Sequence, residues 1–210
     1  MASIVRAKSG NHKLVARQRE RIARAALSLY IKRGFRNTGV QQVAKAARMS
    51  AGNLYHYINS SEDILSLVVD LTNTRLQTEL KEILRSTEPL NPAKALASLI
   101  KSAYQLVDRN QDFIMFMFQE TRHLTPKARK PASDLEFQII SFMEDLLRKG
   151  CESGDFNIEG DIRTFAHDVL VMIEMWSLRR WFYNNRVTLE DHIRIHTCYI
   201  LRCICKNKDI

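Results

Sequence analysis

Apolar residues recur at helical spacing along almost the whole of this 210-residue chain, and this feature most restricts its fold. Between residues 15 and 34, for example, Ile22, Ala26 and Leu29 share one face of a helix, while arginines follow the other face. No run of four or more residues shows the apolar–polar alternation of a half-buried strand. Glycine (7) and proline (4) are scarce, which favours long helices over a turn-rich β fold. We therefore predict an all-α protein with about nine helices.

Helix boundaries are marked by short polar segments and by glycine or proline. Gly34 should end the first helix as a left-handed residue, and Arg48-Met49-Ser50 should separate the second helix from the third. Ser60-x-x-Asp63 is a capping signal for a long helix that runs to about Arg85. Thr125-Pro126 is expected to open a turn. The remaining helices are predicted over residues 93–107, 112–121, 134–149, 161–183 and 189–205.

Positive charge is concentrated in the first 60 residues, which carry 12 Lys or Arg and a single acid, Glu20. Their formal charge is +11, whereas the other 150 residues hold 20 bases and 22 acids, a charge of −2. A basic segment joined to a near-neutral body indicates a polyanionic partner for that segment. A basic targeting arm or a solvated face is the other interpretation of the same charges. We expect residues 1–13 to form a flexible basic arm.

Two short helices joined by a tight turn follow the long basic helix, which is the plan of a helix-turn-helix unit. In such a unit the last helix enters the major groove and offers small or polar side chains to base edges. From Ala51 onward, Leu54 and Ile58 share one helix face at i, i+4 spacing and can anchor that helix to the domain. The other faces present Gly52, Asn53, Tyr55 and His56.

The segment from Gly34 to Leu65 resembles the DNA-binding domain of TetR-family (tetracycline-repressor-like) transcriptional regulators. The resemblance covers roughly residues 17–66, and the rest of the chain is similar to the family in length and helical content. It implies a three-helix DNA-binding domain over residues 14–60 and a larger helical domain over 61–210 that binds an effector and dimerises. The positions that match the family pattern are Gly34-Phe35, Val43-Ala44, Ser50, Gly52, Leu54-Tyr55, Tyr57 and Glu62-Asp63.

Three residues depart from the family pattern. Ser61 stands where the family usually has a lysine that contacts phosphate, so this contact is weakened or moved to the N-terminal arm. Arg48 occupies a turn position that is often glycine, and a positive φ there would cost energy in any other residue. Gly39 replaces the common serine or threonine cap of the second helix. None of these changes removes the motif.

The resemblance also implies roles for individual residues of this chain. Gly52 would remove side-chain bulk where the protein backbone approaches DNA, and Lys13 and Arg17 could add contacts from the arm. The implied partner is double-stranded DNA with a palindromic operator, because the two recognition helices of a dimer lie roughly 34–36 Å apart, one DNA turn. Base contacts are implied for Gln41, Gln42, Ala51, Asn53 and His56, and phosphate contacts for Thr38, Tyr55, Tyr57 and Ser61.

The larger predicted domain is rich in Met and aromatic residues, which line adaptable apolar pockets but also form ordinary cores. Residues 119–126 and 175–183 are similar to segments of TetR-type regulators of fatty-acid and acyl-CoA metabolism. This second resemblance implies an acyl-CoA or a long apolar acid as effector, and we expect no cofactor. It makes Arg122, His123, Arg179 and Arg180 candidates for head-group contacts, and Phe116, Met172 and Trp176 candidates for the apolar wall.

The last two long helices, 161–183 and 189–205, are expected to form a homodimer seam as a four-helix bundle across a two-fold axis. Repression is the usual output in the resembled family. An effector that favours one spacing of the two recognition helices would then release the repressor from DNA, by no more than its differential affinity allows.

Two other kinds of regulator remain as alternatives. His192 and His196, four residues apart on a helix with Cys198 nearby, could make the protein a metal-responsive regulator. An architectural DNA-binding protein without a ligand would instead have a fully packed C-terminal domain. An enzyme is not expected, because the sequence contains no P-loop, Rossmann glycine fingerprint or nucleophile elbow.

The sequence also indicates where the protein works. Its N-terminus lacks the apolar core of a secretory signal, and no stretch of about 18 apolar residues occurs. The spacing of Cys151, Cys198, Cys203 and Cys205 is not a disulfide framework for a chain of this size. We therefore expect a cytoplasmic protein without a membrane partner.

Overall fold

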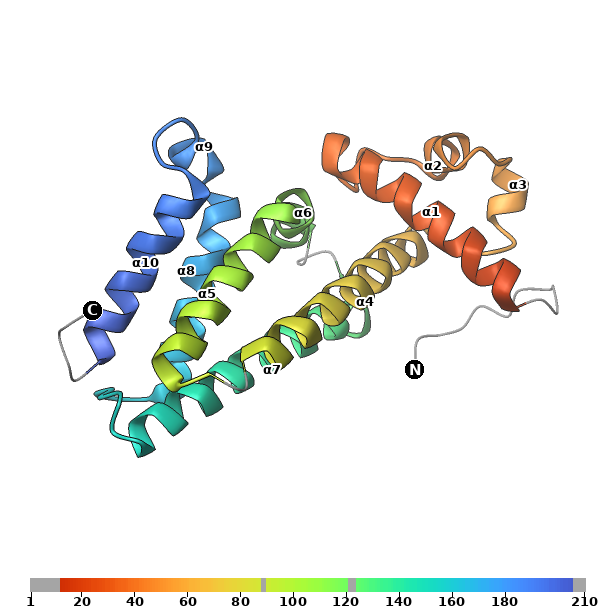
Figure 1. The fold of residues 1–210 in the computed structure, drawn as a ribbon. Helices are drawn as coiled ribbons and strands as arrows, with labels where there is room; N and C mark the ends of the chain where they lie inside the picture. Colours follow the sequence, from red (N-terminus) through yellow and green to blue (C-terminus); the bar gives the residue numbers. More distant parts are fainter. Residues whose placement is uncertain (1–11, 88–89, 121–123, 206–210) are drawn as a thin grey trace. The chain divides into compact units, whose positions relative to one another are not determined.

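The computed structural model describes residues 12–87, 90–120 and 124–205, whose regular structure is helical (Figure 1). The all-α prediction is confirmed, with ten helices in these residues where about nine were expected. The helices are α1 (His12–Arg33), α2 (Val40–Ala46), α3 (Ala51–Leu54), α4 (Ser61–Thr87), α5 (Pro92–Arg109), α6 (Gln111–Glu120), α7 (Pro126–Glu152), α8 (Ile162–Leu178), α9 (Arg180–Tyr183) and α10 (Leu189–Ile204).

The chain divides into two compact units. Unit 1 contains the described residues up to Leu76 and those of Met115–Ser133. Unit 2 contains those of Gln77–Ile114 and those from Asp134 onward. The helices α4, α6 and α7 each begin in one unit and end in the other. Every described residue of the predicted DNA-binding domain lies in unit 1.

Unit 1 is built on the amphipathic helix α1, which packs against α2, while α2 packs against α3 (Figure 1). The apolar spacing that predicted a helix also identified its buried face. Side chains of the two packed helices exclude water there, as burial of apolar surface requires. The residues concerned include Ile22, Ala26 and Tyr30 of α1 and Val43 and Ala44 of α2.

Two turns of unit 1 have left-handed backbone, as the sequence predicted. Gly34 ends α1 with a φ of +79°, and its N–H donates back into the last helical turn at 2.7 Å. Arg48 has a φ of +52° although it is not glycine. The capping signal before α4 is also confirmed, because the Ser60 hydroxyl accepts the Asp63 N–H at 3.2 Å and the Asp63 carboxylate accepts the Asn59 N–H at 2.8 Å.

Two predicted boundaries were wrong at helix N-termini. The long helix α7 begins at Pro126 and not near residue 134, with Pro131 inside it. Pro126 occupies the first position of α7, where the missing N–H of a proline has no helical partner to lose. His12 and Lys13, which were assigned to the flexible arm, belong to α1. Residues 1–11 of that arm lie outside the described residues.

The predicted helix over residues 161–183 is in fact two helices, α8 and α9, with a break at Arg179 (φ −112°, ψ +23°). The physical reason is a ring contact. Trp176 and Tyr183 stack with centroids 5.2 Å apart. Seven residues along a straight helix would span about 10.5 Å. The helix therefore breaks between these two residues, and their rings can pack together.

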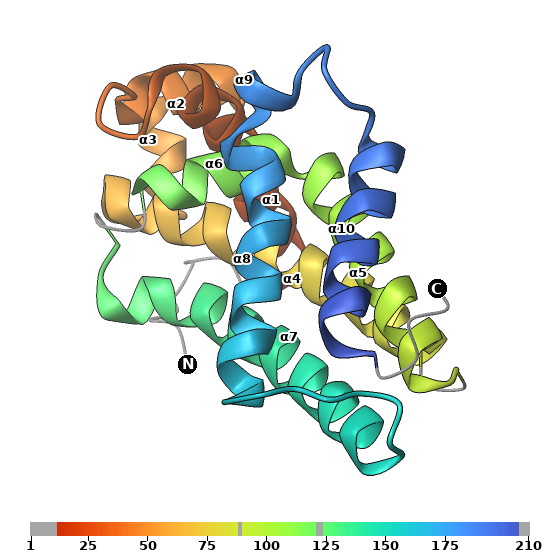
Figure 2. The same cartoon turned by 90° about the vertical axis from the view of Figure 1, so that its left-hand side faces the viewer.

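In unit 2, α5 lies beside both α8 and α10 (Figures 1 and 2). Its buried side is formed by Leu96, Leu99, Ile100 and Tyr104, which belong to one core cluster with residues of α7, α8 and α10. Near the end of α7, Gly150 contributes to this packing by having no side chain. An added Cβ would lie 2.0 Å from the ring of the buried Phe156.

Candidate DNA-binding surface and effector-binding residues

The recognition segment is held by a very short helix, not by the longer one predicted. Only Ala51–Leu54 is α-helical, and the Ser50 hydroxyl caps it by accepting the Asn53 N–H at 3.1 Å. The next two bonds run from His56 N–H to the Asn53 carbonyl oxygen and from Tyr57 N–H to that of Leu54. These i→i−3 bonds form a tighter turn, which still buries both predicted anchors, Leu54 and Ile58.

Most side chains assigned to base contacts are accessible. Gln41 and Gln42 on α2 and Asn53 and His56 on the recognition segment are exposed, while Ala51 is half-buried. An exposed amide or imidazole above a buried apolar anchor can contact a base edge without disturbing the core.

Gln42 has a second task besides any contact with DNA. Its side-chain oxygen Oε1 accepts the backbone N–H of Gly39 at 3.1 Å, which satisfies a donor at the N-terminus of α2. Gly39 has no side chain and cannot supply the usual reciprocal cap. The amide NH₂ of Gln42 can still donate outward, but the bonded oxygen limits how the amide can turn.

Thr38, for which the resemblance implied a phosphate contact, makes hydrogen bonds inside the protein. The residue is only 6% exposed, and its hydroxyl donates to the Gly34 carbonyl oxygen at 2.9 Å. Its backbone N–H donates to the Phe35 carbonyl oxygen. Both donors of Thr38 therefore close the turn between α1 and α2 in this structure, and its phosphate contact stays a prediction.

The phosphate-contact positions around α4 are accessible but carry an acidic neighbour. Tyr55 is exposed, and Tyr57 and Ser61 are partly exposed. The Ser61 hydroxyl donates to the Glu62 carboxylate at 3.1 Å. The backbone N–H of Glu62 and the neighbouring serine hydroxyls hold the pKa of this carboxyl below its ordinary value. A negative charge thus lies beside the position where the family usually has lysine.

Gly52 occupies open space. A Cβ added to this residue would have no protein atom within 4 Å, and Gly52 does not have a positive φ. Neither internal packing nor backbone conformation in the described residues explains glycine here. The prediction that Gly52 accommodates something outside the chain is compatible with this geometry.

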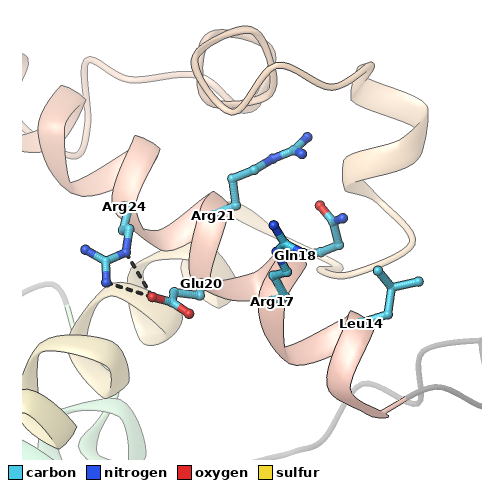
Figure 3. Close-up of a pocket in the computed structure, with 6 residues that line it drawn as sticks. All are labelled: Leu14, Arg17, Gln18, Glu20, Arg21 and Arg24. Carbon is cyan, nitrogen blue, oxygen red and sulfur yellow. Dashed lines mark hydrogen bonds and ion pairs between the residues drawn. The ribbon is translucent and has the colours of Figure 1, made fainter.

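A basic groove of about 450 Å³ runs along α1 and was not predicted (Figure 3). Within it, Arg24 is paired with Glu20 at 2.7 Å. Arg21 donates from its Nη2 to the Arg48 carbonyl oxygen in the turn between α2 and α3, at 3.1 Å. Charge density on α1 predicted a basic face, but only folding showed that one arginine reaches this turn. The groove is lined by Leu14, Arg17, Gln18, Glu20, Arg21 and Arg24.

The residues predicted to bind the effector fall into different parts of the molecule. Phe116 belongs to unit 1, where its ring stacks on Tyr30 with centroids 5.7 Å apart. Met172 and Trp176 lie on α8 of unit 2, Met172 at the surface and Trp176 buried. Arg179 and Arg180 are exposed at the start of α9. Arg122 and His123 lie outside the described residues.

Trp176 belongs to a polar aromatic cluster that sequence reasoning missed. Its Nε1–H donates to Asp108 of α5 at 2.7 Å. In the same cluster the Tyr104 hydroxyl bonds the His196 Nδ1 at 2.7 Å, and the His192 and His196 rings lie 4.0 Å apart. His192 also packs against Trp176. The only signal of this cluster in the sequence was the i, i+4 histidine pair, which was interpreted as a possible metal site.

The geometry of the histidine pair favours packing over metal binding. His192 is 4% exposed, and its burial together with the neighbouring His196 lowers its pKa to about 4. Burial also lowers the pKa of His196, whose Nδ1 is engaged by Tyr104. In the described residues no group of three or more His, Cys, Asp or Glu side chains is placed to hold a metal ion.

One carboxylate of unit 2 is strongly perturbed. Burial raises the pKa of Glu174 on α8 to about 7, and the nearby Glu136 carboxylate adds to this effect, while His167 opposes it. This carboxyl group is therefore partly protonated at neutral pH, whereas a glutamate at the surface would be ionised.

Both halves of the chain match models of one protein family. Residues 22–68 match the family described as bacterial regulatory proteins, tetR family, and residues 89–204 match the tetracyclin repressor-like C-terminal domain. The chain belongs to the TetR family. It is therefore a DNA-binding transcriptional regulator, as predicted, and the first match spans the second half of α1, α2, α3 and the start of α4.

Individual relatives agree with this assignment. The TetR-family chain is 28% identical to the HTH-type transcriptional regulator HbdR of Aromatoleum sp. (strain CIB), over 86% of this chain and 78% of HbdR. It is 26% identical to the HTH-type transcriptional repressor KstR2 of Rhodococcus jostii (strain RHA1), over 75% and 76%. Its fold is similar to that of AibR in complex with isovaleryl coenzyme A and operator DNA, with a TM-score of 0.72, 22% identity and coverage of 87% and 97%.

The helices that this TetR-family protein was predicted to use for dimerisation carry exposed apolar side chains. Val171 and Met172 lie on the surface of α8, and Tyr199 is 63% exposed on α10. Among the described residues, no helix is long and apolar enough to span a bilayer.

Proposed function

We propose that this TetR-family protein is a dimeric repressor that binds a palindromic operator and is released from it by an acyl-CoA. The observation that supports operator binding best is the recognition segment itself. Asn53 and His56 are exposed directly beside Leu54 and Ile58, which are fully buried. This arrangement offers hydrogen-bonding groups to a groove from a rigid base. Because an operator is reached only inside the cell, we place the protein in the bacterial cytoplasm.

The other proposed contacts surround this pair. Gln41, Gln42, Ala51 and Gly52 would approach base edges or the DNA backbone, and Tyr55, Tyr57 and Ser61 would approach phosphates. Thr38 would also approach a phosphate, and its hydroxyl would then give up the hydrogen bond that it donates to Gly34. The acidic Glu62 beside Ser61 indicates that the cation usually present here is replaced by another base, for which Arg17 of α1 is the candidate.

Operator binding can be tested by fluorescence anisotropy with DNA from upstream of the protein's own gene. We expect Asn53→Ala and His56→Ala each to weaken binding by roughly 5- to 100-fold, since a good base contact contributes about 1–3 kcal/mol. Gln138→Ala, which changes an exposed amide on α7, is the matched control and should bind as the parent does. If both substituted proteins bind as tightly as the parent, the assignment is wrong.

The acyl-CoA effector is proposed from two lines of support. Residues 119–126 and 175–183 are similar to segments of fatty-acid-responsive regulators, and AibR has been crystallised with isovaleryl coenzyme A. In unit 2 the end of α8 places the buried Trp176 near the exposed Arg179 and Arg180, an apolar group followed by cations. Met172 on α8 is a further candidate for this site. Phe116, a further candidate for the apolar wall, belongs to unit 1, and the candidates Arg122 and His123 lie outside the described residues.

A thermal-shift titration with acyl-CoAs of increasing chain length tests the effector. The parent should be stabilised by a subset of chain lengths, since a ligand that binds only the folded state raises its stability. The same compounds should displace the operator, whereas CoA alone should not. Arg179→Ala and Arg180→Ala should weaken the shift, and Arg202→Ala, an exposed arginine on α10, should leave it unchanged. No shift with any chain length would exclude this effector class.

Dimerisation through α8 and α10 is proposed because Val171 and Tyr199 expose apolar surface on the two helices. Val171→Asp should convert the dimer into a monomer in multi-angle light scattering and should lower operator affinity. Phe137→Asp, at an exposed aromatic residue on α7, should leave the dimer intact. A dimer that persists in Val171→Asp and Tyr199→Asp would place the interface elsewhere.

A further inference from the structure

The turn between α2 and α3 is closed by a residue that ordinarily would be glycine. After α2, the Met49 N–H donates to the Ala44 carbonyl oxygen and the Arg48 N–H to that of Lys45, both at 3.0 Å. This pair of bonds is a Schellman motif, in which the residue at the position of Arg48 is left-handed. Arg48 accordingly has a φ of +52°. A Cβ is disfavoured in this conformation, so the turn is under local strain.

A single side chain from α1 engages this strained residue. Arg21 Nη2 donates to the Arg48 carbonyl oxygen at 3.1 Å, across 27 positions of the sequence. The hydrogen bond is charge-assisted and therefore stronger than a neutral one. In Figure 3 the Arg21 side chain extends away from Glu20 and Arg24, which form an ion pair with each other at 2.7 Å between Arg24 Nη2 and Glu20 Oε1.

The contact lies where it has most influence on the recognition segment. Arg48 precedes by two residues Ser50, the N-cap of α3, and Asn53 follows the cap by three. The Arg48 peptide therefore sets the direction in which α3 begins. The segment that follows contains only one short helical turn and two i→i−3 bonds. This little regular structure does not fix the direction of α3 independently of the Arg48 peptide.

We propose that Arg21 is a positioning residue for operator recognition. Its guanidinium holds the left-handed Arg48 turn and so fixes the angle at which α3 presents Asn53 and His56. The inference rests on the proposed operator binding. It differs from a direct contact of Arg21 with phosphate, because it predicts that the importance of Arg21 depends on the residue at position 48.

The test is a double-mutant cycle with two readouts. Arg21→Met is made in the parent and in the Arg48→Gly and Arg48→Ala backgrounds. Glycine relieves the left-handed strain, whereas alanine removes the same charge and keeps the strain. Arg24→Met, one helical turn further along α1, is the matched control. Operator affinity is measured against salt concentration, and amide hydrogen exchange across Met49–Leu54 is measured without DNA.

We expect Arg21→Met to weaken operator binding about 10-fold in the parent and in Arg48→Ala, but less than 3-fold in Arg48→Gly. The slope of log affinity against log salt should stay the same, because no phosphate contact is lost. Exchange at Met49–Leu54 should accelerate in Arg21→Met and not in Arg24→Met. Arg21→Lys, which keeps a donor on a long side chain, should restore part of the affinity.

Two results would overturn the proposal. The first is an equal loss of affinity in all three backgrounds with a salt slope reduced by about one, which indicates a direct phosphate contact. The second is unchanged exchange at Met49–Leu54 in Arg21→Met. If the parent itself binds no operator, the proposed function fails, and the exchange measurement alone then decides whether Arg21 holds the turn.

Discussion

Gly52 and Gly150 are both helical glycines, and they are present for opposite reasons. At Gly150 in unit 2 an added Cβ would lie 2.0 Å from the Phe156 ring, so the interior of the protein requires the absence of a side chain. At Gly52 on α3 nothing in the protein lies within 4 Å of the added atom. The glycine of unit 2 is therefore explained by its own contacts, whereas no contact in the described structure explains Gly52, which fits its predicted place against DNA.

The polar groups of the two regions differ in the same way. In unit 2, Trp176 donates to Asp108 and Tyr104 bonds His196, so polar atoms are paired where water is excluded. On the recognition segment, Asn53 and His56 are exposed and their side chains are directed at no core. Substitutions in unit 2 should therefore reduce stability, whereas substitutions on α3 should reduce binding and leave stability almost unchanged.

The largest effect is expected for Gly150→Ala. The new methyl group cannot be accommodated, because the ring it meets is itself 1% exposed and enclosed by the core. Overpacking of this kind costs about 3 kcal/mol of unfolding free energy, which urea denaturation can measure. Gly154→Ala is not a suitable control because Gly154 has a φ of +81°, so Lys149→Ala, at an exposed position of α7, serves instead. A stable Gly150→Ala protein would show that Phe156 is free to move.

A smaller effect should follow from acid. Burial and the neighbouring His196 lower the pKa of His192 to about 4, from an ordinary value of 6.5. Between these two pH values, His192 is therefore protonated in the unfolded chain and neutral in the folded chain. Its contribution to stability is complete above pH 6.5 and is lost as the pH falls to 4, by roughly 2 kcal/mol.

Urea denaturation of the parent and of His192→Gln across this pH range provides the measurement. The parent should lose more stability than the substituted protein between pH 6.5 and 4. Equal slopes for the two proteins would mean that the imidazole is not buried as the structure shows.

Glu174→Gln should have an effect of opposite sign. Burial and Glu136 raise the pKa of Glu174 to about 7 from 4.5, so the folded chain binds a proton that the unfolded chain releases. The parent should therefore lose stability as the pH rises from 4.5 through 7. Glu174 is partly exposed, so we expect a loss of only about 1 kcal/mol.

At pH 8, Glu174→Gln should accordingly be more stable than the parent, and at pH 4.5 the two should be equal. Glu159→Gln, at an exposed carboxylate between α7 and α8, is the control. A stability difference that does not change with pH would rule out the shifted pKa as its cause.

The smallest effect on stability is expected for Gly52→Ala, which should raise the unfolding free energy by less than about 1 kcal/mol because alanine favours helix. Operator affinity should nevertheless fall at least 10-fold if DNA backbone approaches this position. Gly52→Ala should thus lower operator affinity without lowering stability, whereas Gly150→Ala should lower stability. A Gly52→Ala protein that keeps full operator affinity would remove the external reason for this glycine.

Much of the DNA-binding unit could be predicted because its signals are local. Gly34 and Arg48 were expected to be left-handed from their turn positions, and the Ser60–Asp63 cap joins residues only three positions apart. Burial of Leu54 and Ile58 followed from a spacing of four. The internal hydrogen bond from the Thr38 hydroxyl to Gly34 was not predicted, because the position of Thr38 in the motif does not reveal it.

The environment of Trp176, a predicted effector-binding residue, was harder to judge, because its partners are distant in sequence. Trp176 forms a hydrogen bond with Asp108, 68 positions away, and Tyr104 forms one with His196, 92 positions away. The sequence showed the i, i+4 histidines, but helix periodicity does not say which side chains of another helix will face them. The break between α8 and α9 was missed for the same reason, since it depends on a stacked ring pair and not on a helix-breaking residue.

The sequence by itself determined the helical fold, the helix-turn-helix unit and its basic charge, because spacing, caps and charge are properties of neighbouring residues. Only the tertiary structure decided that Arg21 meets Arg48, that Thr38 is closed off, and that Gly150 but not Gly52 is required by packing. Contacts between distant segments depend on how whole helices pack, and no short stretch of sequence carries that information.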